Sequence, residues 1–561
     1  MVTDCLRQRV VDKWGRGAWA GAAVMVAVAL PLLIWPAVAA GGTSYYVSPA
    51  GDDSQAGTSA EASLKTIGKA ASLVKAGDAI NVAPGVYAER VAPAASGTAE
   101  AAITIRKTPG AEGEVVWTSP PGTPKIWDDN YVLNLKGRQW WVVEGLTFRD
   151  CGAWIFLWEA HHNTVRDCVF DGAAIYNCLR VSHGSYNRIL RCDFRRARAY
   201  EADAGGVAKG QADYIEIFHD SHHNLVEDCR FAEIGHVAVA VSGYSGTTVA
   251  RWNIVRQCTF DAPRWKCFGA SASEYTLLEN CTMTGRAALF MQIEASKTIV
   301  RRNTFTGYVS NGRGEATMRG VLRLASTYNS DKRGESCPAH DNRFYHNLFT
   351  GNERTIATYA MQNTIERNVF KNNIFFNNGQ TAWFCQWPTV KESDAAFVGN
   401  VLMGRAAGEK LLGYYKEAYT LKEAQAARPD LVHDNLEADP KLADAAKGDW
   451  RLAEGSPCID AAQPLSRTTA AGQGKVVPVD DPLYFCDGWE LIEPDRVVVG
   501  TNAVAKVVKV DYEKKTLTLE REIAWQAGQA VNLEYAGKGP DIGPLERGAE
   551  AVLGRRTASK K

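Results

Sequence analysis

The sequence predicts an all-β solenoid, in which short parallel strands stack coil upon coil, and three of its features lead to this prediction. A phrase of eight residues recurs from residue 163 onward, and its apolar positions alternate as in a β-strand. Glycine, at 50 residues, and asparagine are frequent, which favours turns over long helices. A repeat this short cannot bury its own apolar face, so successive copies must stack to form a shared core.

The repeated phrase defines the frame of the coils. Its copies are Asn163–Phe170, Asn187–Phe194, Asn224–Phe231, Asn253–Phe260, Thr276–Met283, Thr298–Phe305, Asn342–Phe349 and Asn363–Phe370. Stacking places equal positions above one another at about 4.8 Å per coil. The sixth position then forms a column of Cys168, Cys192, Cys229, Cys258 and Cys281, continued by Asn303, Asn347 and Asn368. We expect these five cysteines to be buried thiols, because stacked strands give poor disulfide geometry.

The first 40 residues have the order of a signal peptide. Basic residues precede an apolar run from Ala18 to Trp35, and the small residues Ala37-Val38-Ala39 follow it. The alternative is an uncleaved membrane anchor, since the run is nearly long enough to span a bilayer. Two prolines in and after the run favour cleavage after Ala39. We therefore expect a secreted, periplasmic or cell-surface protein that has no membrane segment once the signal peptide is removed.

The charge of the chain limits its partners. The formal net charge is zero, from 63 basic and 63 acidic residues. Long-range attraction toward nucleic acid or an anionic membrane is therefore not expected, and an acidic ligand must be bound by a local patch. We expect a monomer whose partner is a polysaccharide.

Both ends of the mature sequence resemble the pectate lyase-like right-handed β-helix superfamily. Near the start, Tyr45 to Asp53, a helical pattern over Leu64 to Val74, and Ala76 to Tyr87 are similar to its N-terminal cap, where a short helix closes the first coil. Near the end, Gly455 to Asp460 and Gly539 to Glu546 are similar to phrases that end bacterial members. The resemblance implies a right-handed parallel β-helix. It does not define a reaction, because the superfamily includes lyases, hydrolases, epimerases and non-enzymes.

These features divide the chain into six parts. The predicted parts are a signal peptide at 1–40, the cap at 41–100, the coils at 101–405, a C-terminal helix and closing segment at 406–475, a small β module at 476–546 and a disordered tail at 547–561. Residues 406–430 are expected to be helical, with Thr420 to Glu423 as a capping box. The β module is expected on the C-terminal end of the coils, with strands at Val504 to Val510, Thr516 to Glu520 and Ala530 to Tyr535.

The resemblance also implies where a ligand would bind, since β-helix enzymes bind extended sugar chains in a groove along one parallel sheet. We therefore aligned the strands that precede each phrase. The alignment gives an outward row of Arg180, Glu216, Ala240, Gly269, Gln292 and Arg323. Three positions earlier, Asp213 and Lys266 share a column, and His236 lies beside it below Trp265. If these coils stack without a bulge, Asp213, His236 and Lys266 lie within roughly 10 Å, two coil spacings.

An acid, an imidazole, an amine and an aromatic ring on one sheet edge suit a sugar-binding active site. The predicted catalytic residues are Lys266, His236, Asp213 and Glu216, and the predicted substrate-binding residues are Arg180, Trp265, Arg323 and Glu294. The competing interpretation is that these residues have no functional role. In that case His236 is an ordinary surface group, and Lys266 only packs its apolar stem over Trp265.

The predicted function is that of a polysaccharide lyase acting on a uronate-containing polymer. β-Elimination requires neutralisation of the uronate carboxylate, a base for the C5 proton and an acid for the leaving oxygen. Arg180 or Arg323 would neutralise the carboxylate, or a calcium ion on Asp213 and Glu216 would do so. Lys266 or His236 would be the base. No other cofactor is expected.

Two other functions remain open on the same fold. A glycoside hydrolase requires two carboxylates about 5 Å apart for retention or about 6.5–9.5 Å apart for inversion. Glu216 and Glu294 lie three coils apart, roughly 14 Å, which leaves Asp213 with Glu216 as the pair. The third function is a non-catalytic carbohydrate-binding or cell-surface scaffold.

Two pairs of histidines lie outside this site. His161-His162 and His222-His223 each precede a repeat asparagine, so we expect them to form structural turns. The segment from His219 to His222 contains metal-ligand residue types, but its spacing is not typical of a particular metal site.

Overall fold

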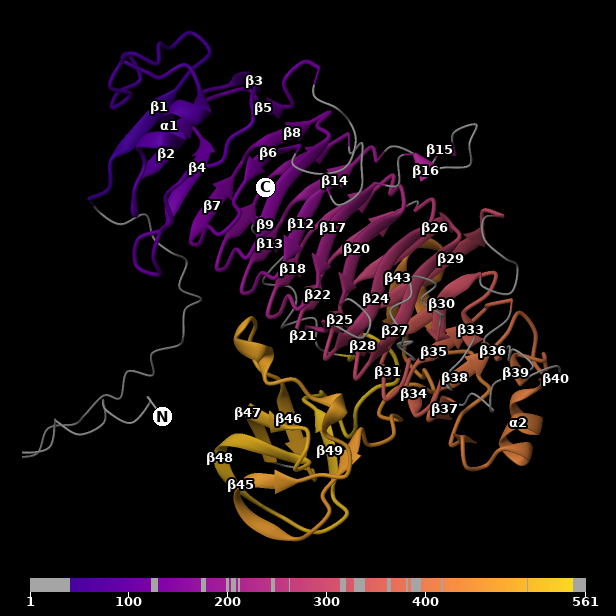
Figure 1. The fold of residues 1–561 in the computed structure, drawn as a ribbon. Coiled ribbons are helices and arrows are strands. Elements are labelled where there is room, and N and C mark those ends of the chain that lie inside the picture. The colour runs from indigo at the N-terminus through magenta and orange to yellow at the C-terminus, as the bar shows by residue number, and fades with distance from the viewer. Residues whose placement is uncertain are drawn as a thin grey trace, which may run out of the picture.

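The computed structural model describes residues 41–122, 130–172, 178–197, 201–202, 208–209, 212–243, 248–261, 263–312, 319–326, 339–360, 365–379, 382–384, 395–414, 417–501 and 503–547. Most of these residues wind into a column of coils, and successive coils add strands to three parallel sheets (Figure 1). A smaller antiparallel sheet lies beside this column (Figure 1). The predicted signal peptide and nearly all of the predicted tail fall outside the described residues.

Three sheets form the walls of the column. Sheet A consists of β1 (Ser44–Val47), β2 (Ala79–Val82), β4 (Ile103–Lys107), β7 (Trp141–Glu144), β10 (Thr164–Arg166), β13 (Arg188–Leu190), β18 (Leu225–Glu227), β22 (Ile254–Arg256), β25 (Leu277–Glu279), β28 (Ile299–Arg301), β31 (Arg343–Tyr345), β34 (Asn368–Lys371), β37 (Ala395–Val398) and β41 (Val432–His433). Sheet B consists of β3 (Gly85–Ala88), β5 (Val115–Thr118), β8 (Thr147–Arg149), β11 (Val169–Asp171), β14 (Asp193–Arg195), β19 (Arg230–Ala232), β23 (Thr259–Asp261), β26 (Thr282–Ala287), β29 (Thr304–Ser310), β32 (Leu348–Thr350), β35 (Ile374–Phe376) and β38 (Val401–Met403). Sheet C consists of β6 (Tyr131–Asn134), β9 (Ala153–Trp158), β12 (Leu179–Ser182), β17 (Asp213–Phe218), β20 (Val237–Ser242), β24 (Lys266–Glu274) with β21 (Ala250–Arg251) paired to it, β27 (Leu289–Ser296), β30 (Gly320–Ser326), β33 (Ile356–Ala360), β36 (Ala382–Phe384), β39 (Leu412–Tyr414) and β40 (Glu417–Tyr419).

Each copy of the repeated phrase from Asn163–Phe170 to Asn342–Phe349 supplies one strand of sheet A and one of sheet B, and the strands between phrases form sheet C. Stacked aromatic rings fill the interior at the eighth position: Phe170 and Phe194 have ring centroids 4.6 Å apart, and Phe231 follows at 4.9 Å from Phe194. These rings are fully buried, as are the apolar residues at the third position of the phrase. The predicted parallel β-helix is confirmed, and its frame is confirmed for the copies from Asn163 to Phe349.

The sixth position forms the predicted column of cysteines and asparagines. The column passes from Cys281, whose backbone N–H donates to Asn303 Oδ1 at 2.9 Å, to Asn347, which accepts from Asn303 Nδ2 at 3.0 Å. The prediction for its next member is wrong: Asn347 Nδ2 donates to Asn373, not Asn368. Asn368 belongs to a parallel ladder and accepts from Asn342 Nδ2 at 2.8 Å.

The error has a simple origin, because two overlapping segments match the last copy of the phrase. Residues 363–370 and 368–375 both carry asparagine at positions one and six and phenylalanine at position eight. The second segment stacks Phe375 on Phe349, with ring centroids 4.6 Å apart, and continues the amide ladder through Asn373. Asn347 and Asn373 are both buried, and each has its amide donor and acceptor satisfied, which stabilises this register.

The cysteine column leads to a prediction about thiol reactivity. Cys168, Cys192, Cys229, Cys258 and Cys281 are buried and form no disulfide. Burial raises the pKa of Cys192 and Cys229 well above its usual value, so little reactive thiolate forms. We expect none of the five to react with an aromatic disulfide reagent at neutral pH in the native protein, and all of them to react after denaturation. Rapid labelling of the whole column in native protein would contradict this packing.

The histidine pairs form turns, as predicted. His162 and His223 occupy the left-handed backbone region, with φ of 58° and 55°. Their rings belong to a stack on the outer turn between sheets C and A, with Tyr186 4.9 Å from each. Trp140 extends the stack at one end, with its ring centroid 4.2 Å from that of His162.

The two helices close the ends of the column. Helix α1 (Ile67–Leu73) packs Ile67, Ala70 and Ala71 inward against β1 and β2, as expected for a cap. Helix α2 (Leu421–Ala427) begins at the predicted capping box of Thr420 and Glu423. The prediction of helix from residue 406 is wrong, because this stretch instead contains β39 and β40, which extend sheet C by backbone hydrogen bonds.

Several short elements complete the described chain. They are β15 (Glu201–Ala202), β16 (Ala208–Lys209), β42 (Leu442–Asp444), β43 (Asp449–Leu452) and the 3₁₀ helices Ala445–Lys447, Pro482–Tyr484 and Gly488–Glu490. In the part of the chain that the structure describes, no helix has the length and apolar character needed to cross a membrane.

The C-terminal module is a six-stranded antiparallel sheet. It consists of β44 (Ser466–Arg467), β45 (Gly472–Pro478), β46 (Arg496–Val499), β47 (Ala503–Asp511), β48 (Thr516–Trp525) and β49 (Ala530–Leu533). The predicted strands are present, but the module lies against the flank of sheet A and not on the C-terminal end (Figure 1). The second position of the phrase explains this: Leu225, Ile254 and Leu277 point outward there and join Val497 and Leu517 in one apolar cluster.

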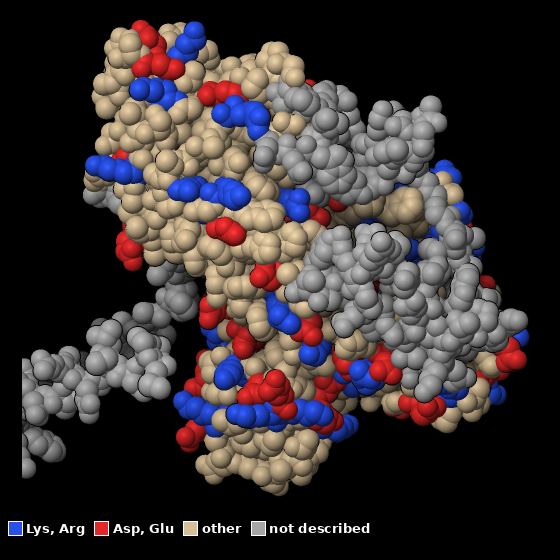
Figure 2. Space-filling view, viewed as in Figure 1, with Lys and Arg blue, Asp and Glu red and all other residues tan. Residues whose placement is uncertain are grey.

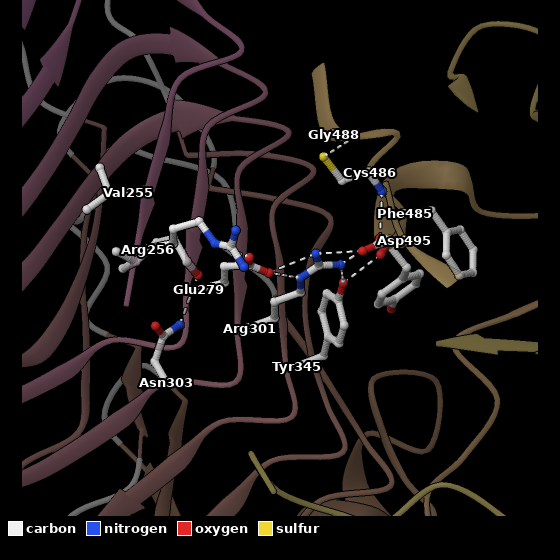
Figure 3. A network of polar contacts seen from close by, with 12 residues as sticks. Val255, Arg256, Glu279, Arg301, Asn303, Tyr345, Phe485, Cys486, Gly488 and Asp495 are labelled. Carbon is white, nitrogen blue, oxygen red and sulfur yellow. Dashed lines mark hydrogen bonds and ion pairs between the residues drawn. The ribbon is translucent and has the colours of Figure 1, made fainter. Parts of the chain in front are cut away.

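A buried ionic network connects the module to the column (Figure 3). The Arg301 guanidinium donates to both carboxylate oxygens of Asp495 at 2.7 and 2.8 Å and to Glu279 at 2.9 Å. It also donates to the hydroxyl of Tyr345, which in turn donates to a backbone carbonyl of the module. Although burial opposes it, the surrounding Asp495, Tyr345 and Glu279 hold the pKa of Arg301 above its usual value.

Charge is distributed unevenly over the visible surface. Acidic and basic side chains are interleaved around the C-terminal module, whereas much of the face of the N-terminal coils carries none (Figure 2).

Candidate active site

The outward row predicted on sheet C is present. Strand pairing places Arg180 beside Glu216, and the row continues through Ala240, Gly269, Gln292 and Arg323. Each step joins neighbouring parallel strands between β12 and β30, so the row runs along the sheet without interruption. The register is therefore confirmed, while the roles of these residues stay predictions.

The predicted column of Asp213 and Lys266 also forms, with Val237 between them. Asp213 is buried, and its Oδ1 atom lies 2.7 Å from Nδ1 of His236 and accepts from the Val237 N–H at 3.1 Å. The carboxylate thus orients the imidazole. Trp265 lies beside His236, with ring centroids 6.2 Å apart, as the sequence predicted.

Lys266 bends back over its own strand. A Cβ atom added at Gly269 would lie 3.4 Å from Cε and 3.5 Å from Nζ of Lys266. Because Gly269 has no side chain, the end of the Lys266 side chain can lie over it. Nζ donates to Gln292 Oε1 at 3.4 Å. Burial lowers the pKa of Lys266 to about 8, and Arg323 acts in the same direction, while Glu294 and Asp213 oppose it. An amine with this pKa is close to the value required of a base at neutral pH.

Glu216 and Arg180 form a pair at the N-terminal end of the row. Arg180 Nε and Glu216 Oε2 are 3.5 Å apart, and their side chains are only 17% and 13% exposed. Burial raises the pKa of Glu216 to about 8, against the effect of Arg180 and with that of Asp213. Glu216 is therefore largely protonated at neutral pH and can donate a proton.

Gln292 contacts the amine and is itself bonded to Glu294. Glu294 is buried, lies two residues further along the same strand, and accepts from Gln292 Nε2 and from Ser271 Oγ. Gln292 in turn accepts from Lys266. The sequence placed Gln292 and Gly269 in the row but gave them no role. The feature of the sequence that could have indicated a role for them is the row itself, in which small and amide side chains stand between charged ones.

The two arginines of the row are separated. Arg180 and Arg323 lie five coils apart, roughly 24 Å, with Gly269 between them. One uronate carboxylate cannot meet both. Arg323 is the nearer to the amine, two coils from Gly269, and it influences the pKa of Lys266.

A calcium ion on Asp213 and Glu216 does not fit these contacts. Calcium requires six to eight oxygen ligands, mostly ionised carboxylates and carbonyls. Asp213 is instead engaged by His236 and the Val237 N–H, and Glu216 faces Arg180 with a raised pKa. No group of three or more His, Cys, Asp or Glu residues among those described is arranged to hold a metal ion.

The site therefore combines a base of lowered pKa, an acid of raised pKa, an oriented imidazole and two separated cations along one face. These properties suit proton transfer on an anionic chain that lies across several coils. The described coils form a right-handed parallel β-helix.

Comparisons with known proteins agree with this class. The sequence matches a family described as right handed beta helix region over residues 131–307, and a family described as protein of unknown function over 49–93. A search of curated protein sequences finds no relative.

Solved structures similar to the chain include several lyases. A pectate lyase, Pel9A, is 17% identical, with 90% of this chain and 96% of that chain covered and a TM-score of 0.41. A mannuronic acid-specific family 6 polysaccharide lyase from human gut microbiota is 11% identical, with coverage of 70% and 85% and a TM-score of 0.43. A rhamnogalacturonan lyase is 15% identical, with coverage of 57% and 83% and a TM-score of 0.40. The similarity is one of fold.

Proposed function

We propose that the protein is an exported polysaccharide lyase that cleaves a uronate-containing polysaccharide along the outer face of sheet C. The observation that carries the proposal is the Lys266 amine, which has a pKa of about 8 and lies over Gly269 between Arg323 and Asp213. An amine of this kind is suited to removing the weakly acidic C5 proton of a uronate.

The other groups complete the β-elimination. Arg323 would neutralise the carboxylate on C5, which stabilises the negative charge that develops when the C5–H bond breaks. The electron pair forms the C4–C5 double bond, and the C4–O bond breaks. The leaving oxygen takes a proton from His236, which lies beside Lys266. Glu216 lies four strands from Arg323 along the row, about 19 Å, and so does not reach the same sugar unit. Lys266 and the acid then exchange protons with water to restore the starting state.

A glycoside hydrolase is the second candidate, and the raised pKa of Glu216 favours it specifically. A protonated Glu216 beside Asp213 on strand β17 would provide an acid and a second carboxylate. The buried contact of Asp213 with His236 weakens this alternative, because it directs the Asp213 carboxylate to the imidazole. A non-catalytic carbohydrate-binding scaffold is the third candidate.

One assay separates the three functions. Purified protein is mixed with polygalacturonate, alginate and chondroitin sulfate, and absorbance is followed near the band of unsaturated uronates. A lyase raises the absorbance; a hydrolase produces new reducing ends without it. Binding with neither signal would identify a scaffold and refute an enzymatic role.

Export is part of the proposal, and its support is the charge, apolar run and small residues of the first 39 positions. We expect the protein from its native host to begin after Ala39. Intact-mass measurement tests this, and a mature chain that retains Met1 would indicate an anchor instead.

A further inference from the structure

A group of aromatic side chains lies next to Arg180 on sheet C and its outer turn, on the N-terminal side of the candidate active site. We call Trp158, His183, Phe218 and His219 the aromatic strip. The ring centroids of Trp158 and His183 are 5.0 Å apart, and those of His183 and His219 are 4.4 Å apart with nearly parallel planes. Phe218 and His219 follow at 4.1 Å.

Strand register explains why the rings meet. Trp158, Ser182 and Phe218 occupy one outward column of successive strands, and Ser182 is small enough to be covered by its neighbours. His183 and His219 follow their strands in the left-handed region, with φ of 51° and 61°, which turns both rings onto this column. His219 Nδ1 lies 2.5 Å from the Ser182 hydroxyl, which anchors the ring.

The aromatic strip is continuous with the candidate active site and has a cation at each end. The guanidinium of Arg180, in the outward row, lies 5.3 Å from the centroid of Phe218. At the other end, exposed Lys136 places Nζ 5.7 Å from the ring of Trp158. Burial, His183 and Arg180 lower the pKa of His219 to about 4, so this ring is uncharged at neutral pH.

We propose that the aromatic strip binds sugar rings of the same acidic polysaccharide, several units away from the bond that is cleaved. The proposal rests on the proposed function, because it takes the bound polysaccharide to be the substrate of the lyase. Trp158 lies four strands before Lys266 along sheet C, about 19 Å, so a chain that reaches both must be an oligosaccharide. Lys136 and Arg180 would hold uronate carboxylates at the two ends of the strip.

The chemistry of the strip favours a sugar chain over a protein partner. Aromatic faces flanked by cations match a pyranose, which has apolar ring faces and, in a uronate, a carboxylate at its edge. A stable protein interface buries about 800 Å² on each partner, far more than four side chains in one column provide.

Native electrophoresis in gels that contain polygalacturonate, alginate or chondroitin sulfate tests the proposal, with neutral xylan as the control polymer. All proteins carry Lys266→Ala, so that the polymer is not cleaved. Adding Trp158→Ala should weaken binding about tenfold, the scale of one lost aromatic contact. Adding Trp158→Phe should retain most of the binding, because a ring remains, and this variant also controls for folding.

Trp140→Ala is the matched control, because Trp140 also stacks on a histidine but belongs to the turn stack with His162. It should bind as the parent does. Lys136→Ala should weaken binding at low salt and lose this effect at high salt, as screening removes the charge attraction.

The outcomes separate this proposal from the lyase assignment. Binding that depends on Trp158, together with no rise in absorbance when the protein with Lys266 intact is mixed with the same polymers, would refute the lyase and support the strip. Equal binding by Trp158→Ala and its parent, equal weakening by Trp140→Ala, or equal retardation in xylan would overturn the proposal. Absence of retardation in all three uronate gels would overturn it as well.

Discussion

Lys266→Ala is expected to lower kcat by about 100-fold or more, since loss of a general base has an effect of this size. The variant removes the amine that lies over Gly269 and faces Gln292. Turnover is measured by absorbance on the polymer found to be cleaved, with folding checked by circular dichroism. His236→Ala is expected to lower turnover too, because the imidazole is oriented by Asp213 toward the same site.

His162→Ala is the control, since His162 stacks in the turn ladder outside the site. It should keep near wild-type turnover. If Lys266→Ala and His236→Ala did so as well, the reaction would have to take place elsewhere, and Glu294 with Arg323 would be the next residues to replace.

The position of the amine can be tested without removing it. Gly269→Ala adds a Cβ in ordinary contact with the Lys266 side chain, at 3.4 and 3.5 Å, and should reduce turnover only slightly. Gly269→Val adds two further methyl groups in the same space and should reduce it strongly. Equal activity of the two variants would show that the amine does not act from this place.

The lowered pKa of Lys266 predicts the pH dependence of kcat/KM. Lys266 must lose its proton to act as the base, so activity should rise with pH through its pKa of about 8. The expected profile therefore rises between pH 6 and about pH 9. A profile that is flat from pH 6 to 10 would exclude Lys266 as the base.

Asp495→Ala is expected to destabilise the protein by about 3–5 kcal/mol, the usual cost of an uncompensated buried charge, because Arg301 and Arg256 are then left to share the single carboxylate of Glu279. Arg301 is 3% exposed and Glu279 5%, so solvent screens the uncompensated charge only weakly (Figure 3). The backbone N–H of Cys486 loses its acceptor as well. The midpoint of urea unfolding measures the effect.

Arg496→Ala is the matched control on the neighbouring residue. Arg496 pairs with Glu534 at 2.7 Å, but the two side chains are 53% and 44% exposed. Such surface pairs contribute about 0–1 kcal/mol. Similar losses from Asp495→Ala and Arg496→Ala would mean that the buried network does not hold the module against sheet A.

Most of the structure that could be predicted from the sequence came from the repeat. Positions three, six and eight of the phrase predicted which side chains point inward. The spacing between phrases predicted the register, which aligns Asp213 with Lys266 and Glu216 with Gln292. Register is readable because a slip by one residue would turn every apolar side chain of a strand outward. The same rule failed for the last copy, where two overlapping segments satisfy the phrase and only the stacking of Phe375 on Phe349 distinguishes them.

The sequence by itself determined the fold class, the cap and the residues that line the outer face of sheet C. Only the tertiary structure decided which of these residues touch, because side-chain direction depends on neighbours from other coils. It directed Lys266 over Gly269, separated Arg180 from Arg323, and brought Trp158 against His183. The tertiary structure also decided where the C-terminal module lies. Leu225 and Ile254 point outward from sheet A, and the module stabilises the fold by burying them. No local pattern in the sequence of the module specifies sheet A as its packing partner.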